Sequence, residues 1–315
     1  MGYKGKIGIL LAVSVTAIAL FLFYELNHWE YVLPRRGLKV AAIIVTGAAI
    51  AFSTVVFQTI TNNRILTPSI IGLDSLYVLI QTFIIFSFGS MSVAVLNKNL
   101  NFVLSVIVMI MFALLLFKLL YKKEGQNVYF LLLVGIIFGT FFSSLTTFMQ
   151  VLIDPNEFLT VQNRMFASFN NVNSDILMLS VGVFIVVWLY SLRFIKYLDV
   201  LSLGRDQAIN LGVPFDYVVN RLLIVIAILV SISTALVGPI TFLGLLVANV
   251  AYEFLKTYKH KYLISAAILI SIIALVGGQF IVERIFTFST TLSVIVNFVG
   301  GVYFLYLLLK ERKSW

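Results

Sequence analysis

The chain has 315 residues, of which 61% are hydrophobic and only 11% are charged. Soluble globular domains carry roughly 25% charged residues, so this composition excludes a water-soluble fold. The absence of cysteine excludes a disulfide framework, a zinc–thiolate site, an iron–sulfur cluster and a cysteine nucleophile. In a chain of this kind, the net charge of +9 is expected to reflect membrane topology rather than nucleic-acid binding.

Ten continuous apolar runs follow one another along the chain, and a membrane-spanning helix needs about 20 mostly apolar residues. The runs are residues 7–24, 40–61, 73–93, 102–120, 128–152, 176–195, 222–237, 240–255, 262–282 and 292–309. They are continuous rather than alternating, which favours helices over a β-barrel. The sequence therefore predicts an all-α integral membrane protein with about ten transmembrane helices, forming a single domain over residues 1–315.

The basic residues indicate how this bundle is oriented. An even number of spans places both termini on one side of the membrane. With the termini inside, 16 of the 22 Lys and Arg residues lie in inner segments, Lys122 and Lys123 among them, and six lie outside. The outer six are Arg35, Arg36, Lys39, Lys98, Arg164 and Arg284. Because Lys and Arg are enriched in cytoplasmic segments, we predict a multi-pass cell-membrane protein with both termini in the cytoplasm.

One inner connection, residues 199–217, has more pattern than a simple linker. Within it, Leu203, Ala208 and Leu211 are apolar among polar neighbours, and Gly204 and Gly212 lie near the two ends. This pattern is typical of a short amphipathic helix with a glycine stop. We therefore expect such a helix within residues 203–212, lying at the cytoplasmic surface.

The predicted spans hold almost no ionisable side chains. Asp74, Asp175 and Glu283 fall near span ends, and His28 and His260 are expected to be solvated loop residues. Carriers that use protons or sodium usually need such groups in the membrane, which counts against the alternative of an ion-coupled secondary transporter. The sequence also has no phosphate-binding loop, and no serine, histidine and carboxylate trio falls at a common depth in the membrane. What remains is a pore-forming subunit driven by another protein, as in the membrane subunit of a binding-protein-dependent ABC importer.

Four segments, in order along the chain, carry a resemblance to a known family. Residues 47–58 resemble its second-span signature, and Asn63 with residues 68–72 resembles its inner turn. Residues 203–212 are similar to its ATPase-docking loop, and residues 238–245 to its Gly-Pro-Ile-Gly-Phe-x-Gly-Leu segment. The family is that of the iron–siderophore (FecCD-type) permeases, which includes the membrane subunit of the vitamin B12 importer.

The chain also departs from the family pattern at three places. It has Ala248 and Asn249 where the family usually has Pro-His, and Asn63-Arg64 where the family has Asn-Pro. The family's outer Arg-Leu-Pro-Arg appears here as residues 36–39, with Pro-Arg shifted just ahead. These departures are most similar to the branch that imports ferric siderophores, including petrobactin-like catecholates, in Gram-positive bacteria.

The resemblance implies a type II ABC importer permease that translocates a ferric siderophore inward and is not itself catalytic. Haem and cobalamin are the alternative cargoes within the family. The implied partners are a second permease subunit, identical or similar, two cytoplasmic ATPase subunits that hold the ATP, and an extracytoplasmic substrate-binding (lipo)protein, all beside membrane lipid. Nucleic acid is not an expected partner, and neither a cofactor nor a metal is expected to bind the chain directly.

The resemblance also assigns roles to particular residues. The outer rim, which is expected to dock acidic residues of the binding protein, consists of Arg36, Lys39 and Arg284. The coupling segment, residues 203–212, is expected to contact the ATPase through Leu203, Gly204, Arg205, Asp206, Gln207, Ala208, Leu211 and Gly212. Asn63 and Ile65 match positions that narrow the cytoplasmic exit in the vitamin B12 importer, and the alternative is an ordinary solvated turn. Gln58, near the inner end of its span, either caps a helix or lines a gate on the pathway. Asn297, a lone polar residue in the last span, either bonds a neighbouring helix or faces the pathway.

Overall fold

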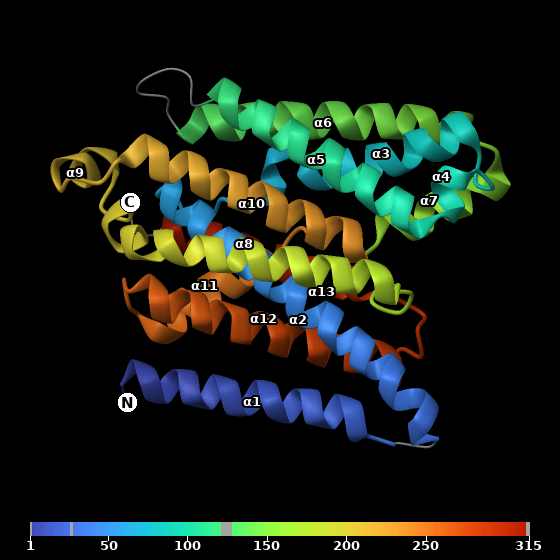
Figure 1. The fold of residues 1–315 in the computed structure, drawn as a ribbon, viewed down its shortest axis with the longest axis horizontal. Coiled ribbons are helices and arrows are strands. Elements are labelled where there is room, and N and C mark those ends of the chain that lie inside the picture. Colours follow the sequence, from blue (N-terminus) through green and yellow to red (C-terminus); the bar gives the residue numbers. More distant parts are fainter. Residues whose placement is uncertain (1, 26–27, 121–127, 313–315) are drawn as a thin grey trace.

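The computed structural model describes residues 2–25, 28–120 and 128–312, and it is a bundle of long helices (Figure 1). Lys122 and Lys123 lie outside the described residues. The long helices are α1 (Tyr3–Phe23), α2 (Trp29–Ile60), α3 (Leu73–Phe88), α5 (Lys98–Leu120), α6 (Val128–Leu152), α8 (Ser174–Leu201), α10 (Phe215–Val237), α11 (Leu243–Leu255), α12 (His260–Arg284) and α13 (Leu292–Arg312). Four short elements are η1 (Pro68–Ile71), α4 (Val93–Leu96), α7 (Pro155–Met165) and α9 (Arg205–Asn210).

A long helix occupies each of the ten apolar runs, which confirms the predicted all-α membrane fold. Among the described residues, seven helices are long and apolar enough to cross a membrane. The three others, α3, α11 and α13, contain shorter apolar helices. The ten spans are thus of unequal length.

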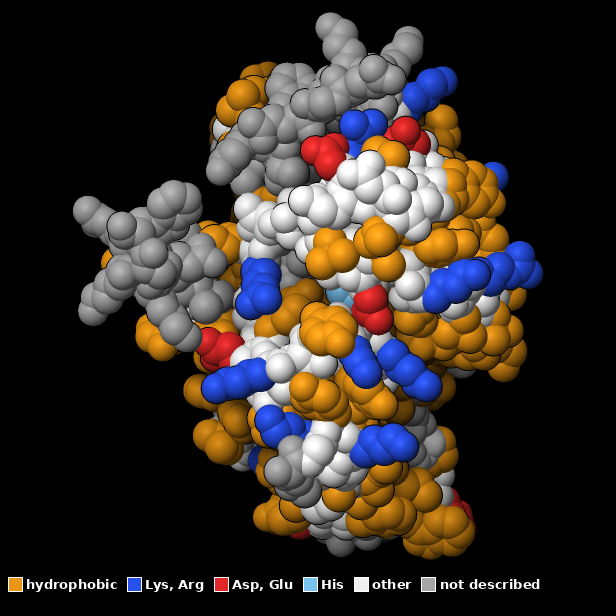
Figure 2. All heavy atoms as spheres, turned by 90° about the vertical axis from the view of Figure 1, so that its left-hand side faces the viewer, with side chains coloured by type: hydrophobic (Ala, Val, Ile, Leu, Met, Phe, Trp, Pro, Cys, Tyr) orange, Lys and Arg blue, Asp and Glu red, His pale blue; other side chains and the backbone are white. Residues whose placement is uncertain are grey.

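The long helices lie side by side, with α2 near the centre and α1 at one edge (Figure 1). α2 packs against α8, α10, α11 and α12, whereas α1 packs mainly on α12. The first and last parts of the chain lie at the same end as α9, which we call the inner end; α4 and α7 mark the opposite, outer end. Figure 2 looks at the inner end and shows more basic than acidic side chains there, the distribution on which the predicted orientation depends.

The central helix is longer than its apolar run predicts. α2 begins at Trp29 rather than near residue 40, so the basic stretch around Arg36 is helical and not a loop at its mouth. Its 32 residues extend over about 48 Å, more than the roughly 30 Å of the hydrocarbon core. Pro34, the sixth residue of this helix, has no N–H to donate to the carbonyl of Glu30, so one intrahelical hydrogen bond is missing there.

α7, at the outer end, is absent from the sequence-based prediction although its sequence carries the signal. Asp154 is the N-cap residue, and its side chain accepts a hydrogen bond of 2.8 Å from the backbone N–H of Asn156. Pro155 follows at the first helical position, where its missing N–H costs nothing. The helix is amphipathic rather than apolar, so its sequence does not have the pattern of a membrane span.

Two of the long helices are too short to cross the membrane unaided. α3 has 16 residues and α11 has 13, which corresponds to about 24 and 20 Å. The predicted runs 73–93 and 240–255 are therefore wrong at one boundary each: α3 ends at Phe88, and residues 240–242 are not helical. Irregular segments, residues 61–72 and 238–242, precede the two short helices.

The first irregular segment returns from the inner end to the middle of the bundle. Gly72 has a φ of 87°, and a Cβ atom there would lie 3.0 Å from the Cα atom of Gly139. Gly139 is near the midpoint of α6, so only a glycine at position 72 allows this approach. Non-helical backbone at membrane depth is tolerated only where protein or a cavity surrounds it, and α3 and α6 provide those surroundings.

The second irregular segment meets the first one. The hydroxyl of Thr241 donates a 2.9 Å hydrogen bond to Oδ2 of Asp74, which opens α3 and is buried. Asp74 is the second residue of α3, so it lies at a span end as expected, and its side chain is buried there. The amide oxygen of Asn297 accepts from the backbone N–H of Phe242 at 3.4 Å. Two breaks in the helical pattern, far apart in sequence, thus form one buried junction.

Candidate translocation and coupling sites

The inner turn, residues 61–67, is fastened to two helices through one carbonyl group. The backbone carbonyl of Arg64 accepts from Nε2 of Gln58 at 2.5 Å and from Nδ2 of Asn249 at 3.0 Å. Within the turn, Oδ1 of Asn63 accepts from the backbone N–H of Ile65 at 2.9 Å. Gln58 lies in α2 and Asn249 in α11, so both helices fix the position of the turn.

The two polar residues singled out within spans both make contacts near these segments. Gln58 is 2% exposed, bonds the inner turn and also lines the cavity described next, while Asn297 bonds the segment before α11. Asn249 stands out in the sequence only as a departure from the family's Pro-His pair. Its role could not be inferred from the sequence, because the Arg64 carbonyl that it binds is 185 positions away.

A cavity of about 730 Å³ opens at the inner end beside this turn, and we call it the inner cavity. Asn63 and Arg64 line it from the inner turn, and Leu203 lines it from the coupling segment. The guanidinium of Arg64 lies 4.6 Å from the ring centroid of Tyr252, which also lines the cavity. The inner turn and the coupling segment therefore share one cavity wall, whereas Ile65 is half-buried within the turn.

The coupling segment contains the short helix α9, and glycines bound it as expected. Gly204 and Gly212 have φ values of 99° and 81°, which side-chain-bearing residues rarely adopt. The arrangement of the apolar residues differs from the prediction. Ala208 is fully buried in its own chain, whereas Leu203 and Leu211 are 55% and 63% exposed. The helix is shorter than the predicted residues 203–212, because Leu203 and Leu211 flank α9, and Ala208 packs inward whereas these two leucines are exposed.

The remaining coupling residues project from the inner end. Arg205, Asp206 and Gln207 are exposed, and Ile209 adds a further exposed apolar side chain. Figure 1 shows α9 extending beyond the neighbouring helix ends. Exposed apolar side chains on a projecting helix are a usual sign of a protein partner.

The three residues of the outer rim all have partners within the chain. Nη1 of Arg36, a residue 9% exposed, donates to the carbonyls of Leu22 and Tyr24 at 2.9 and 2.8 Å. It thereby satisfies carbonyls that the end of α1 leaves without helical partners. Nζ of Lys39 lies 2.6 Å from Oε1 of Glu283.

Arg284 is the most accessible of the three, with a side chain 31% exposed. Its guanidinium lies 2.6 Å from a carboxylate oxygen of Glu25. The residues of the outer rim therefore partly serve to hold α1, α2 and α12 together through hydrogen bonds and ion pairs. A neighbouring outer cavity of about 480 Å³ brings together basic residues from two helices, which are Arg35, Arg36, Lys39 and Lys98.

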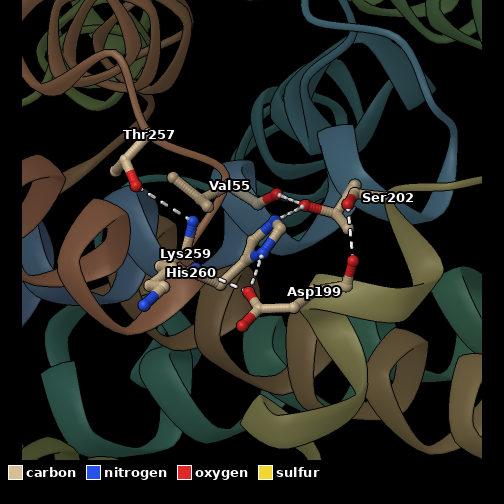
Figure 3. A network of polar contacts seen from close by, with 7 residues as sticks. Val55, Asp199, Ser202, Thr257, Lys259 and His260 are labelled. Carbon is tan, nitrogen blue, oxygen red and sulfur yellow. Dashed lines mark hydrogen bonds and ion pairs between the residues drawn. The ribbon is translucent and has the colours of Figure 1, made fainter.

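His260 was expected in a solvated loop, and this expectation is wrong. It is the first residue of α12 and is 2% exposed, at the inner end of the bundle. Figure 3 shows its ring held between the side chain of Asp199 and the end of α2. His28, in contrast, is exposed as expected.

A ten-helix bundle with two buried irregular segments and a projecting inner helix is the architecture of a multi-span membrane transport subunit. The model of the FecCD transport family matches residues 7–310, and the chain belongs to this family. The predicted permease of an ABC importer is confirmed by this match together with the relatives described next.

Two curated relatives are similar along most of the chain. The petrobactin import system permease protein YclO of Bacillus subtilis is 66% identical over 98% of both chains. The petrobactin import system permease protein FatC of Bacillus anthracis is 38% identical over 89% of this chain and 79% of its own. Among solved structures, an inward-facing metal-chelate type ABC transporter matches with a TM-score of 0.84 at 22% identity, covering 98% of this chain and 100% of that one. This match confirms the predicted type II permease fold.

Proposed function

We propose that this chain forms the membrane pathway through which a ferric siderophore of the petrobactin type enters the cell. The observation that carries the proposal is the 66% identity to YclO over nearly the whole of both chains. Identity at this level extends through the helices that surround any pathway and not only through short motifs. Haem and cobalamin remain the alternative cargoes that the experiment must distinguish.

The chain itself hydrolyses no ATP in this proposal. It pairs with a second permease, and two ATPase subunits bind at the inner end. The exposed apolar side chains of Leu203, Ile209 and Leu211, in α9 and directly beside it, support the coupling segment as the element that enters a groove on the ATPase. ATP-driven closure of the ATPases then moves α9, and packed helices pass this motion to the pathway.

At the outer end, we place the acidic surface of an extracytoplasmic binding protein. The basic outer cavity and the partly exposed Arg284 support this placement. Arg36 contributes by holding the end of α1 in place, and Lys39 by forming an ion pair at the edge of the cavity. Exposed charges of this kind contribute mainly to the rate and orientation of association.

The test is complementation of a strain that lacks its own permease for the chelate. The strain would carry this chain with its partner subunits, and uptake of radioactive iron would be measured for ferric petrobactin, a ferric hydroxamate and haem, with labelled cobalamin in parallel. We expect uptake of the petrobactin chelate alone. Rescue of the hydroxamate, haem or cobalamin without petrobactin would contradict the proposed cargo, with equal membrane levels of the chain as the control.

A further inference from the structure

Three helix ends meet at the buried side chain of His260. Nδ1 of the ring lies 2.8 Å from Oδ1 of Asp199 in α8, and Nε2 lies 2.8 Å from the hydroxyl oxygen of Thr59 in α2. The backbone N–H of His260 donates to the same Asp199 oxygen at 2.7 Å. Figure 3 shows these contacts as a continuous chain across the ring.

The proton positions follow from the chemistry of the partners. A carboxylate only accepts hydrogen bonds, so Nδ1 carries the ring proton, and in the neutral ring Nε2 accepts from the hydroxyl of Thr59. The same hydroxyl lies 2.8 Å from the carbonyl of Val55 in its own helix. Thr59 therefore has two acceptors for one proton, and only one of them belongs to another helix.

Asp199 and Thr59, at the two ends of this chain of contacts, lie next to the coupling segment and the inner turn. Asp199 is in the last turn of α8, and its carbonyl accepts from the hydroxyl of Ser202 at 2.7 Å, directly before the coupling segment. Thr59 is in the last turn of α2, directly before the inner turn. His260 thus connects the base of the coupling segment to the base of the inner turn.

Open space, rather than packed side chains, lies beside this connection. The inner cavity is lined by Asn62 and Asn63 from the inner turn, by Ser202 and Leu203 from the other side, and by His260 itself. A displacement of α9 can pass to α2 through the packing of α8 on α2, and the hydrogen bonds through His260 add a second connection at the ends of these two helices. Hydrogen-bonded side chains that bridge two elements are a physical route for such coupling.

We propose that His260 is a positioning residue of the transport cycle, which couples movement of α9 to the inner turn through Asp199 and Thr59. This inference rests on the proposed function of α9 as the ATPase contact. When the ATPase displaces the base of α9, Asp199 moves with the end of α8, His260 follows, and Thr59 shifts the last turn of α2. The inner turn then changes position in step with ATP binding.

The test uses the complete transporter in lipid vesicles and measures chelate transported per ATP hydrolysed. Thr59→Val removes the hydroxyl but keeps the side-chain shape, and Thr59→Ser is the matched control that keeps the hydroxyl. We expect Thr59→Val to lower chelate transported per ATP about fivefold, which is the ratio that corresponds to one neutral hydrogen bond.

Other outcomes separate the two proposals. If the unaltered complex transports none of the chelates, the proposed function fails before the variants are compared. If it transports and Thr59→Val leaves the ratio unchanged, the His260 connection is overturned while the proposed function stands. A Thr59→Val complex that fails to assemble, or that loses ATP hydrolysis and transport in equal proportion, would show a merely structural role and would also overturn the connection. Rescue by Thr59→Ser, with the loss confined to coupling in Thr59→Val, supports it.

Discussion

Replacing Leu211 by alanine tests whether the exposed apolar residues of the coupling segment bind the ATPase. Leu211 is 63% exposed, so most of its side chain is free to be buried by a partner. Full burial of a leucine side chain contributes about 1.5–3 kcal/mol, and the exposed share corresponds to about 1–2 kcal/mol. Because each 1.4 kcal/mol is tenfold in affinity, the substitution should weaken ATPase binding roughly 5- to 30-fold.

The assay is titration of the purified ATPase onto the permease in lipid nanodiscs. Leu159→Ala is the matched control, since Leu159 is 61% exposed but lies in α7 at the outer end. Ala208→Asp provides a contrast: Ala208 is fully buried, so this change should reduce folded protein rather than affinity alone. Equal ATPase affinity for the Leu211→Ala variant and the unaltered chain would refute the assignment of this segment as the contact.

Three further predictions concern the outer end, the buried junction and the orientation. Arg36→Gln should lower the thermal stability of the purified permease, because two carbonyls at the end of α1 lose a charged donor. Arg284→Gln should mainly slow the association of the binding protein at low salt. Equal losses of stability in the two variants would contradict this division. Gly72→Ala should reduce folded yield, because φ is 87° and the added Cβ would lie 3.0 Å from the backbone of α6, and a wild-type yield would refute that packing. A cysteine at Met91 should react with an impermeant thiol reagent in intact cells and one at Tyr258 should not, since these exposed residues lie at opposite ends of the bundle; the reverse pattern would overturn the orientation.

The fold class and the order of the spans could be predicted from the amino-acid sequence. The cause is physical: a chain in lipid must satisfy its own backbone hydrogen bonds, so each long apolar run forms a helix whatever its neighbours are. The glycines at the two ends of α9 could also be predicted to bound the helix, because a positive φ favours glycine at any place in a fold. The charge distribution along the chain supplied an orientation that the cysteine labelling above can check.

The places where the spans break, and the partners of their polar residues, could not be predicted from the sequence. Asp74 and Thr241 are 167 positions apart, and neither local sequence indicates that their side chains form a hydrogen bond. The sequence predicts Arg36 as an exposed docking charge, whereas in the fold it bonds carbonyls at the end of α1. The sequence predicts His260 as a loop residue, whereas in the fold it bonds the ends of α2 and α8. Local sequence sets the helices because their hydrogen bonds are local, whereas polar partners are chosen by packing between distant segments, and that geometry exists only in the folded bundle.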